Sequence, residues 1–133
     1  MKFSVDRICD CLEEVKPLLK KHWEESEDLG FPLDPDYELY LRIEREGLTR
    51  SFSVRDNGKI VGYAVFIVRH HPHYKTVLTA NADVIFIEKE FRGGKSFIEW
   101  CIDQLKVMGV KVVVYNVKIK NRSFQEIVFV KEI

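Results

Sequence analysis

The chain is organised around residues 84–100, VIFIEKEFRGGKSFIEW. An apolar run of strand length is followed by a short charged turn, the pair Gly93-Gly94 and a segment with helical spacing. Two glycines let the backbone approach a ligand closely, and the N–H groups that begin the next helix carry the positive end of its dipole. The stretch therefore predicts a strand, an anion-binding loop and a helix, with phosphate as the favoured anion.

The composition predicts one domain, residues 1–133, with a single core. Lys plus Arg and Asp plus Glu both number 21, so no net charge draws the chain to nucleic acid or to a membrane, and we expect neither partner. The three cysteines, an odd number, indicate a reducing compartment, and the first residues resemble neither a signal peptide nor a membrane span. We therefore predict a cytoplasmic protein whose function depends on a local site.

The first residues predict a strand and a helix. Residues 2–8 alternate in polarity, as in a short strand. Asp10 and Glu13 have the spacing of a capping box for a helix that ends near Ser26. Pro17 either kinks this helix or marks the restart of a second one.

The middle of the chain predicts a further helix and an antiparallel hairpin. Asp36 can cap a helix that ends at Gly47. Residues 56–59, Asp-Asn-Gly-Lys, favour a tight turn before a strand at 60–68. The extended run at 77–88 predicts the next strand, antiparallel to the previous one.

The last third predicts a crossover. A helix from about Lys95 to Met108 is followed by an apolar run at 110–117, which is typical of a buried strand. A strand, helix and strand of this length normally form a right-handed parallel unit. Residues 127–133 predict a last strand. The fold class is therefore α/β, a mixed and mostly antiparallel sheet with flanking helices and one parallel β-α-β crossover.

The glycine loop differs from two nucleotide-binding motifs. Gly94-Lys95-Ser96 follows a strand and opens a helix, like a triphosphate P-loop, but Lys89 stands where that motif requires its first glycine. The segment also differs from a dinucleotide-binding motif, because no glycine follows Gly93-Gly94 at the remaining spacings of that motif. Both interpretations are disfavoured.

The order of the elements resembles the GNAT superfamily of acyl-CoA-dependent N-acyltransferases. The resemblance covers nearly the whole chain and includes Phe91-Arg92-Gly93-Gly94 and Lys120-Asn121-Arg122. Small phage-type GNAT-like proteins look especially similar, in Lys21-His22-Trp23-Glu24-Glu25, Val61-Gly62-Tyr63-Ala64-Val65-Phe66 and His73-Tyr74. The resemblance implies a GNAT-like sheet with a shortened C-terminal part.

The resemblance also implies acetyl-CoA as co-substrate. The strand at 84–87 would splay from the following strand, so that Ile85, Phe86 and Ile87 line the pantetheine arm. The pyrophosphate would rest on the glycine loop. The implied cofactor-binding residues there are Arg92, Gly93, Gly94, Lys95 and Ser96, together with Asn121.

Catalysis requires a base and an acid. The resemblance places Asp83 and Asn81 near the usual base, and Asp83 is the acid of the two. The family usually protonates the leaving thiolate with a tyrosine a few residues past the position of Asn121, where this chain has Ile127-Val128-Phe129. No tyrosine follows Tyr115.

Other reactive side chains allow less specific interpretations. His70, His71 and His73 lack a cysteine or acid at ligand spacing, so no metal site is predicted, and we assign His70, His73 and Tyr74 to the mouth of the acceptor site. His22 and Trp23 either pack the first helix or line the acceptor pocket. Cys101 is predicted to be a core residue.

Two functions follow from these features. The first is an N-acetyltransferase that moves an acetyl group from acetyl-CoA to an amine of a small molecule or protein. The alternative is a catalytically inactive GNAT-fold protein that acts by binding a protein partner, and a homodimer is also open.

Overall fold

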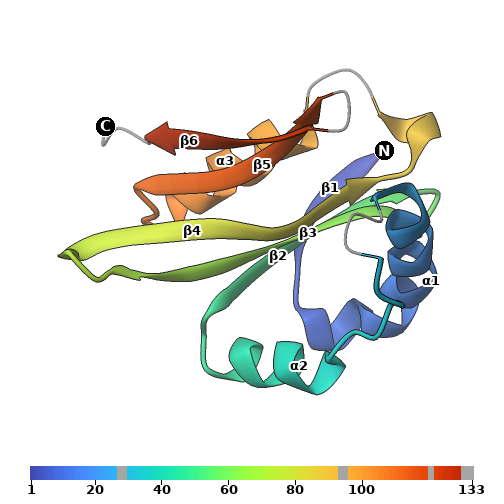
Figure 1. The fold of residues 1–133 in the computed structure, drawn as a ribbon, viewed down its shortest axis with the longest axis horizontal. Helices are drawn as coiled ribbons and strands as arrows, with labels where there is room; N and C mark the ends of the chain where they lie inside the picture. The colour runs from blue at the N-terminus through green and yellow to red at the C-terminus, as the bar shows by residue number, and fades with distance from the viewer. Residues whose placement is uncertain (27–29, 93–95, 120–121, 130–133) are drawn as a thin grey trace.

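The computed structural model describes residues 1–26, 30–92, 96–119 and 122–129. Within them lie three α-helices and one sheet of six strands in the order β1-β2-β3-β4-β5-β6. Adjacent strands are antiparallel except β4 and β5, which are parallel and joined through α3. The predicted fold class is confirmed. The elements (Figure 1) are β1 (Lys2–Asp6), α1 (Ile8–Ser26), α2 (Tyr37–Arg45), β2 (Thr49–Asp56), β3 (Lys59–His71), β4 (Tyr74–Ile87), a short 3₁₀ turn (Lys89–Phe91), α3 (Phe97–Val107), β5 (Val112–Ile119) and β6 (Arg122–Phe129).

Local sequence signals correctly predicted one turn and one helix start. Asn57 and Gly58, between β2 and β3, have φ angles of 50° and 78°, as a type I′ hairpin turn requires. Asp36 caps α2, because its Oδ1 accepts a hydrogen bond of 2.9 Å from the backbone N–H of Leu39. Both features depend on residues close together in the chain.

The predicted capping box of α1 is wrong. The helix begins at Ile8, so Asp10 lies inside its first turn. The carboxylate of Glu44, in α2, accepts hydrogen bonds from the backbone N–H groups of Ile8 and Cys9, at 2.5 and 3.0 Å. A carboxylate there satisfies free N–H groups and complements the helix dipole. This cap also fixes α2 against the start of α1.

Several other boundaries differ from the predictions. α1 is one helix through Pro17, so of the two alternatives for this proline the restart of a second helix is wrong. β3 extends to His71 and β4 begins at Tyr74, so the histidine segment is the end of a tight hairpin rather than a loop. β6 spans Arg122–Phe129, earlier than predicted, because it forms a hairpin directly with β5; residues 130–133 lie outside the described part of the chain.

The sheet separates two hydrophobic layers. On one face, α3 inserts Phe97, Cys101 and Leu105 into a large cluster with buried side chains of the strands, which confirms Cys101 as a core residue. On the other face, α1 contributes Cys11 and Leu18 to a smaller cluster. No residue of α2, which is described throughout, is buried. The face under α1 and α2 is therefore less completely filled. No helix in the described ranges is long and apolar enough to cross a membrane.

Candidate functional site

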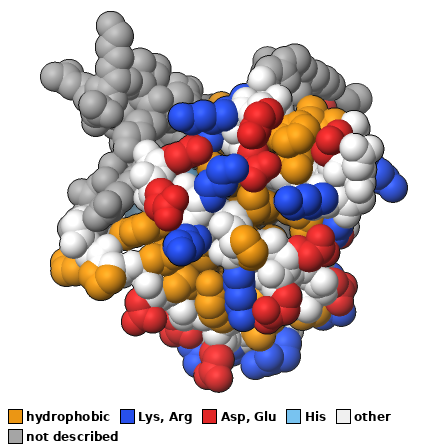
Figure 2. All heavy atoms as spheres, turned by 90° about the vertical axis from the view of Figure 1, so that its right-hand side faces the viewer, with side chains coloured by type: hydrophobic (Ala, Val, Ile, Leu, Met, Phe, Trp, Pro, Cys, Tyr) orange, Lys and Arg blue, Asp and Glu red, His pale blue; other side chains and the backbone are white. Residues whose placement is uncertain are grey.

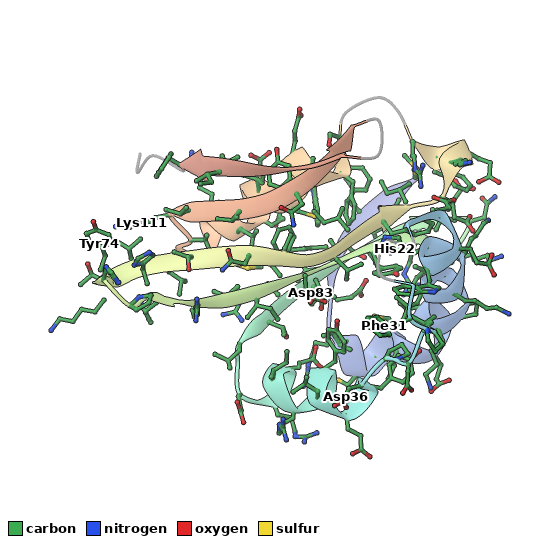
Figure 3. All side chains as sticks on the ribbon, viewed as in Figure 1. His22, Phe31, Asp36, Tyr74, Asp83 and Lys111 are labelled. Atoms are coloured by element: carbon green, nitrogen blue, oxygen red, sulfur yellow. The ribbon has the colours of Figure 1, made fainter. Side chains whose placement is uncertain are left out.

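Strand β4 carries an extra residue opposite β3. Val65 pairs with Val84 and Phe66 pairs with Ala82, so Asp83 has no register partner in β3. Such a bulge interrupts the alternation of side chains along a strand. Asp83 and Val84, although consecutive, both line a cavity between the sheet and the two N-terminal helices. The bulge therefore turns a carboxylate toward the cavity, and Figure 3 shows Asp83 between the sheet and α2.

A tyrosine from α2 holds this carboxylate. The hydroxyl of Tyr40 donates a hydrogen bond of 2.5 Å to Oδ2 of Asp83. Burial, and then the hydrogen bond to Asp83, raise the pKa of Tyr40 well above its usual value. The phenol therefore stays protonated at neutral pH and remains a donor. It fixes the orientation of Asp83 at the cavity wall.

The cavity has a volume of about 710 Å³ and lies among the sheet, α1, α2 and the residues 32–36 that precede α2. This volume falls within the range of roughly 300–1,000 Å³ that small-molecule sites occupy. The helices line it mainly with aliphatic side chains: Ile8, Leu12, Val15, Leu19, Leu39 and Ile43. Its polar groups include Asp83, Tyr40, Tyr63 and His22. The arrangement can enclose an apolar molecule and present a carboxylate to it.

His22, in α1, stands between this cavity and β4. Its ring stacks on Phe86 with 4.7 Å between the ring centroids, and its Nδ1 lies 3.3 Å from the hydroxyl of Tyr63. Burial lowers the pKa of His22, although the Glu25 carboxylate opposes this shift. His22 and the adjacent Trp23 both line the cavity. His22 is thus a neutral aromatic side chain of the wall at pH 7.

Acidification should weaken the fold through His22. Since burial lowers its pKa below the usual value of about 6.5, the unfolded chain binds more protons below that pH, and the free energy of unfolding falls as the pH drops. A single histidine can change the free energy of unfolding by at most about 1.4 kcal/mol per pH unit. Urea unfolding of the wild type and of His22→Gln at about pH 7.5 and about pH 5.5 measures the loss of unfolding free energy between the two pH values. The variant should lose less stability than the wild type, and equal losses would contradict the prediction.

Strands β4 and β5 are paired over a short distance. Within the described residues, 79–81 pair with 112–114, and β5 then continues beside β6. Asn81 is thus the last residue of β4 with a β5 partner, and no described strand covers that edge through Ile87 (Figure 1). The predicted divergence of these strands is confirmed. An uncovered edge presents backbone N–H and C=O groups to any extended chain that carries amides.

The residues predicted to line the pantetheine arm lie along this open edge. Ile85 and Ile87 pack toward the α3 cluster, whereas Phe86 belongs to the cluster under α1. The backbone carbonyl of Ile87 already accepts a hydrogen bond of 2.6 Å from Nε of Arg92. The open edge is therefore bounded at its end by a cation.

Arg92 is held against α1. Its Nη2 lies 2.8 Å from Oε2 of Glu25, and its guanidinium lies 5.6 Å from the centre of the Phe86 ring. This hydrogen bond lowers the pKa of Glu25. Figure 2 shows acidic and basic side chains interspersed on this side of the molecule. Arg92 thus connects the end of β4 to the C-terminal part of α1.

The remaining predicted phosphate-binding residues are only partly described. Ser96 caps α3, because its Oγ accepts a hydrogen bond of 3.2 Å from the backbone N–H of Ile98. Its hydroxyl proton remains a donor. The other members, Gly93, Gly94, Lys95 and Asn121, lie outside the described residues.

The predicted acceptor residues lie at the far end of the β3–β4 hairpin. His70 is in β3, Tyr74 is in β4, and the backbone N–H of His73 donates a hydrogen bond of 3.0 Å to Nδ1 of His71. Figure 3 shows Tyr74 at the other end of the sheet from His22. None of His70, His73 and Tyr74, all described, lines the cavity. The structure therefore does not bring them together with Asp83.

Sequence reasoning missed the two tyrosines of the site. Tyr40 and Tyr63 come from α2 and β3 and meet the cavity only after folding. In the sequence, Tyr63 is part of the segment Val61–Phe66, and Tyr40 lies within the predicted helix that Asp36 caps. No local spacing connects either residue with Asp83.

Comparison with known proteins gives a consistent answer at the level of the fold. No known family profile and no curated protein sequence matches the chain. A ribosomal-protein-alanine N-acetyltransferase from Brucella melitensis biovar Abortus is similar in structure, with 18% identity, a TM-score of 0.64, and coverage of 89% of this chain and 81% of that chain. A predicted acetyltransferase from Clostridium acetobutylicum, solved with acetyl-CoA, is 17% identical with a TM-score of 0.62, and the match covers 90% of this chain and 81% of that chain. An aminoglycoside acetyltransferase from an uncultured soil sample is 15% identical with a TM-score of 0.67, and the match covers 88% of this chain and 77% of that chain. The chain therefore has the fold of the GNAT acetyltransferases.

Proposed function

We propose that the protein is an N-acetyltransferase that moves an acetyl group from acetyl-CoA to an amine. The observation that carries this proposal is the carboxylate of Asp83, turned by the β4 bulge into a cavity of small-molecule size beside the uncovered edge of the same strand. Structures with this fold include acetyltransferases, one of them solved with acetyl-CoA. Their names support the reaction type, not the acceptor.

The residues present fit acetyl-CoA in two respects. The backbone of residues 85–87 offers amide groups along an edge that no described strand covers, which suits a pantetheine arm. Arg92 places a guanidinium at the end of that edge, where it suits a phosphate. When bound, acetyl-CoA would supply an activated acetyl thioester.

Asp83 acts on the acceptor. An amine is mostly protonated at neutral pH, and its nitrogen has no lone pair for attack until a proton leaves. The Asp83 carboxylate receives this proton at the cavity wall, while Tyr40 holds Oδ2 through its hydroxyl. Since a carboxylate can accept several hydrogen bonds, Asp83 can hold Tyr40 and an ammonium together.

Titration calorimetry with acetyl-CoA tests the first requirement of this proposal. We expect saturable heat at micromolar ligand, followed by release of free thiol when an acceptor amine is added. No detectable heat at high micromolar ligand would refute the transferase. Heat without thiol release over a broad amine panel would leave only a binding protein.

Arg92→Ala should weaken acetyl-CoA binding about tenfold, because one charge-assisted contact to a phosphate is lost. Since Glu25 competes for the same guanidinium, Glu25→Gln should leave the affinity unchanged or raise it. Arg69→Ala, on the exposed far part of β3, is the matched control. Calorimetry measures all three, and an unchanged affinity for Arg92→Ala would remove Arg92 from the cofactor site.

One observation favours the alternative of an inactive GNAT-fold protein. Arg92 is already engaged by Glu25 and by the carbonyl of Ile87, so in this state the cation is satisfied within the chain. Under the alternative, acetyl-CoA either gives no heat or binds without release of thiol over the amine panel. Calorimetry followed by the thiol assay therefore separates the two functions.

A further inference from the structure

We propose that the acceptor is a small apolar monoamine, a single primary ammonium on an aromatic or aliphatic body. The inference rests on the proposed function, because it names the substrate of that same cavity. It excludes polyamines, polyhydroxylated amines and amines with an anionic end. Three properties of the cavity carry it: an aliphatic lining, a one-sided set of charges and a single carboxylate on the bulge.

The helical side of the cavity is aliphatic. Leu12, Val15 and Leu19 follow one another at helical spacing along α1, and Leu39 and Ile43 face the same cavity from α2. A hydroxyl-rich ligand placed against these side chains would lose its hydrogen bonds to water without replacement. An apolar body instead gains by leaving water. The cavity therefore selects for a ligand with few polar groups.

The charged groups of the cavity are all of one sign. The described residues that line it include three carboxylates, Asp34, Asp36 and Asp83, and neither lysine nor arginine. His22, the remaining titratable base in the wall, is neutral at pH 7 because burial lowers its pKa. A ligand phosphate or carboxylate would find no counter-charge among these described residues. The net field favours a cation.

The three carboxylates are not equivalent. Asp36 is committed to the N-terminus of α2, where it accepts the N–H of Leu39. Asp34 is exposed on the segment before α2. Asp83 combines a fixed orientation, given by Tyr40, with a position on the strand whose edge is open. One ammonium therefore has one well-placed partner. A second ammonium would reach only Asp34, which is exposed to solvent, or Asp36, which already caps α2.

Binding of small probes to the full chain tests this without acetyl-CoA. The probes are 2-phenylethylamine, 3-phenylpropanoate, which has a similar body and opposite charge, and 1,4-diaminobutane, which has two ammoniums and no ring. Trp23 lines the cavity, so its fluorescence reports occupancy. We expect 2-phenylethylamine to bind at least about tenfold more tightly than the other two. Equal affinities, a preference for either comparison probe, or no binding of 2-phenylethylamine at millimolar concentration would overturn the proposal.

Asp83→Asn separates charge from shape. The variant keeps the size of the side chain and should bind 2-phenylethylamine about tenfold more weakly, with unchanged affinity for neutral 2-phenylethanol. Glu99→Gln, on the exposed face of α3 across the sheet, is the matched control and should change neither affinity. Equal affinity of Asp83→Asn and wild type for the amine would overturn the role of Asp83 in recognition.

The outcomes distinguish this inference from the proposed function. If 2-phenylethylamine binds with the stated preference but acetyl-CoA gives no heat, the transferase fails and the amine site stands. If acetyl-CoA binds and thiol is released only with 1,4-diaminobutane or with hydroxyl-rich amines, the transferase stands and the apolar acceptor is refuted.

Discussion

Asp83→Asn is expected to lower kcat at least about 100-fold, the usual loss when a general base is removed. The asparagine side chain has the same size and can still accept the hydrogen bond from Tyr40, but it cannot take a proton from an ammonium. The β4 bulge depends on strand pairing rather than on this side chain, so the cavity should persist. Thiol release at saturating acetyl-CoA, measured against amine concentration, gives kcat and KM separately.

Two comparisons make this result specific. Acetyl-CoA affinity should be unchanged in Asp83→Asn, because Asp83 lies on the cavity side rather than at the Arg92 end of β4. Tyr40→Phe should reduce kcat by a smaller factor, since the carboxylate remains and only its orientation is less fixed. If Asp83→Asn retained wild-type kcat, the base would have to be another group.

Phe66→Ala should reduce the free energy of unfolding by about 3–5 kcal/mol. Phe66 is fully buried in the cluster under α3, where its ring meets Phe52 edge-on at 5.9 Å between centroids. It is also the residue that pairs with Ala82 beside the bulge. Removing the ring leaves a void at the point where β4 changes register. Urea denaturation followed by circular dichroism measures the loss.

The matched control is Phe129→Ala, in which the same ring is removed from a side chain that is 75% exposed. Its effect should stay within about 0.5 kcal/mol. Because small domains have only about 5–15 kcal/mol of stability, Phe66→Ala is at risk of not folding. Phe66→Leu then provides a milder test, and comparable effects at positions 66 and 129 would refute the assigned core.

Much of the architecture could be predicted because it depends on short-range patterns. The turn at Asn57-Gly58 requires positive φ angles, which these two residue types adopt readily. Asp36 caps α2 through the backbone N–H only three residues later. The order strand, helix and apolar strand, which became β4, α3 and β5, predicts a parallel crossover because such units are almost always right-handed and parallel. The turn and the cap are specified by residues within a few positions of each other, and the crossover follows from the order of its three elements.

The site was less predictable because its contacts join distant parts of the chain. Glu44 caps α1 from another helix, and Tyr40 reaches Asp83 across the cavity. The bulge at Asp83 is a property of the pairing of two strands, and no turn residue marks it. Only the family resemblance indicates Asp83 in the sequence, and the histidines at the hairpin tip have no spacing that relates them to it.

The unequal filling of the two faces of the sheet has an evolutionary consequence. Side chains under α3 determine whether the chain folds, whereas those of α1 and α2 that line the cavity determine mainly what fits beneath them. Substitutions at Leu12 or Ile43, which line the cavity and belong to neither core cluster, can therefore change ligand preference with little loss of stability. Descendants of such a chain can diverge in the molecules they recognise while keeping one scaffold, and their sequences would vary fastest on the two N-terminal helices.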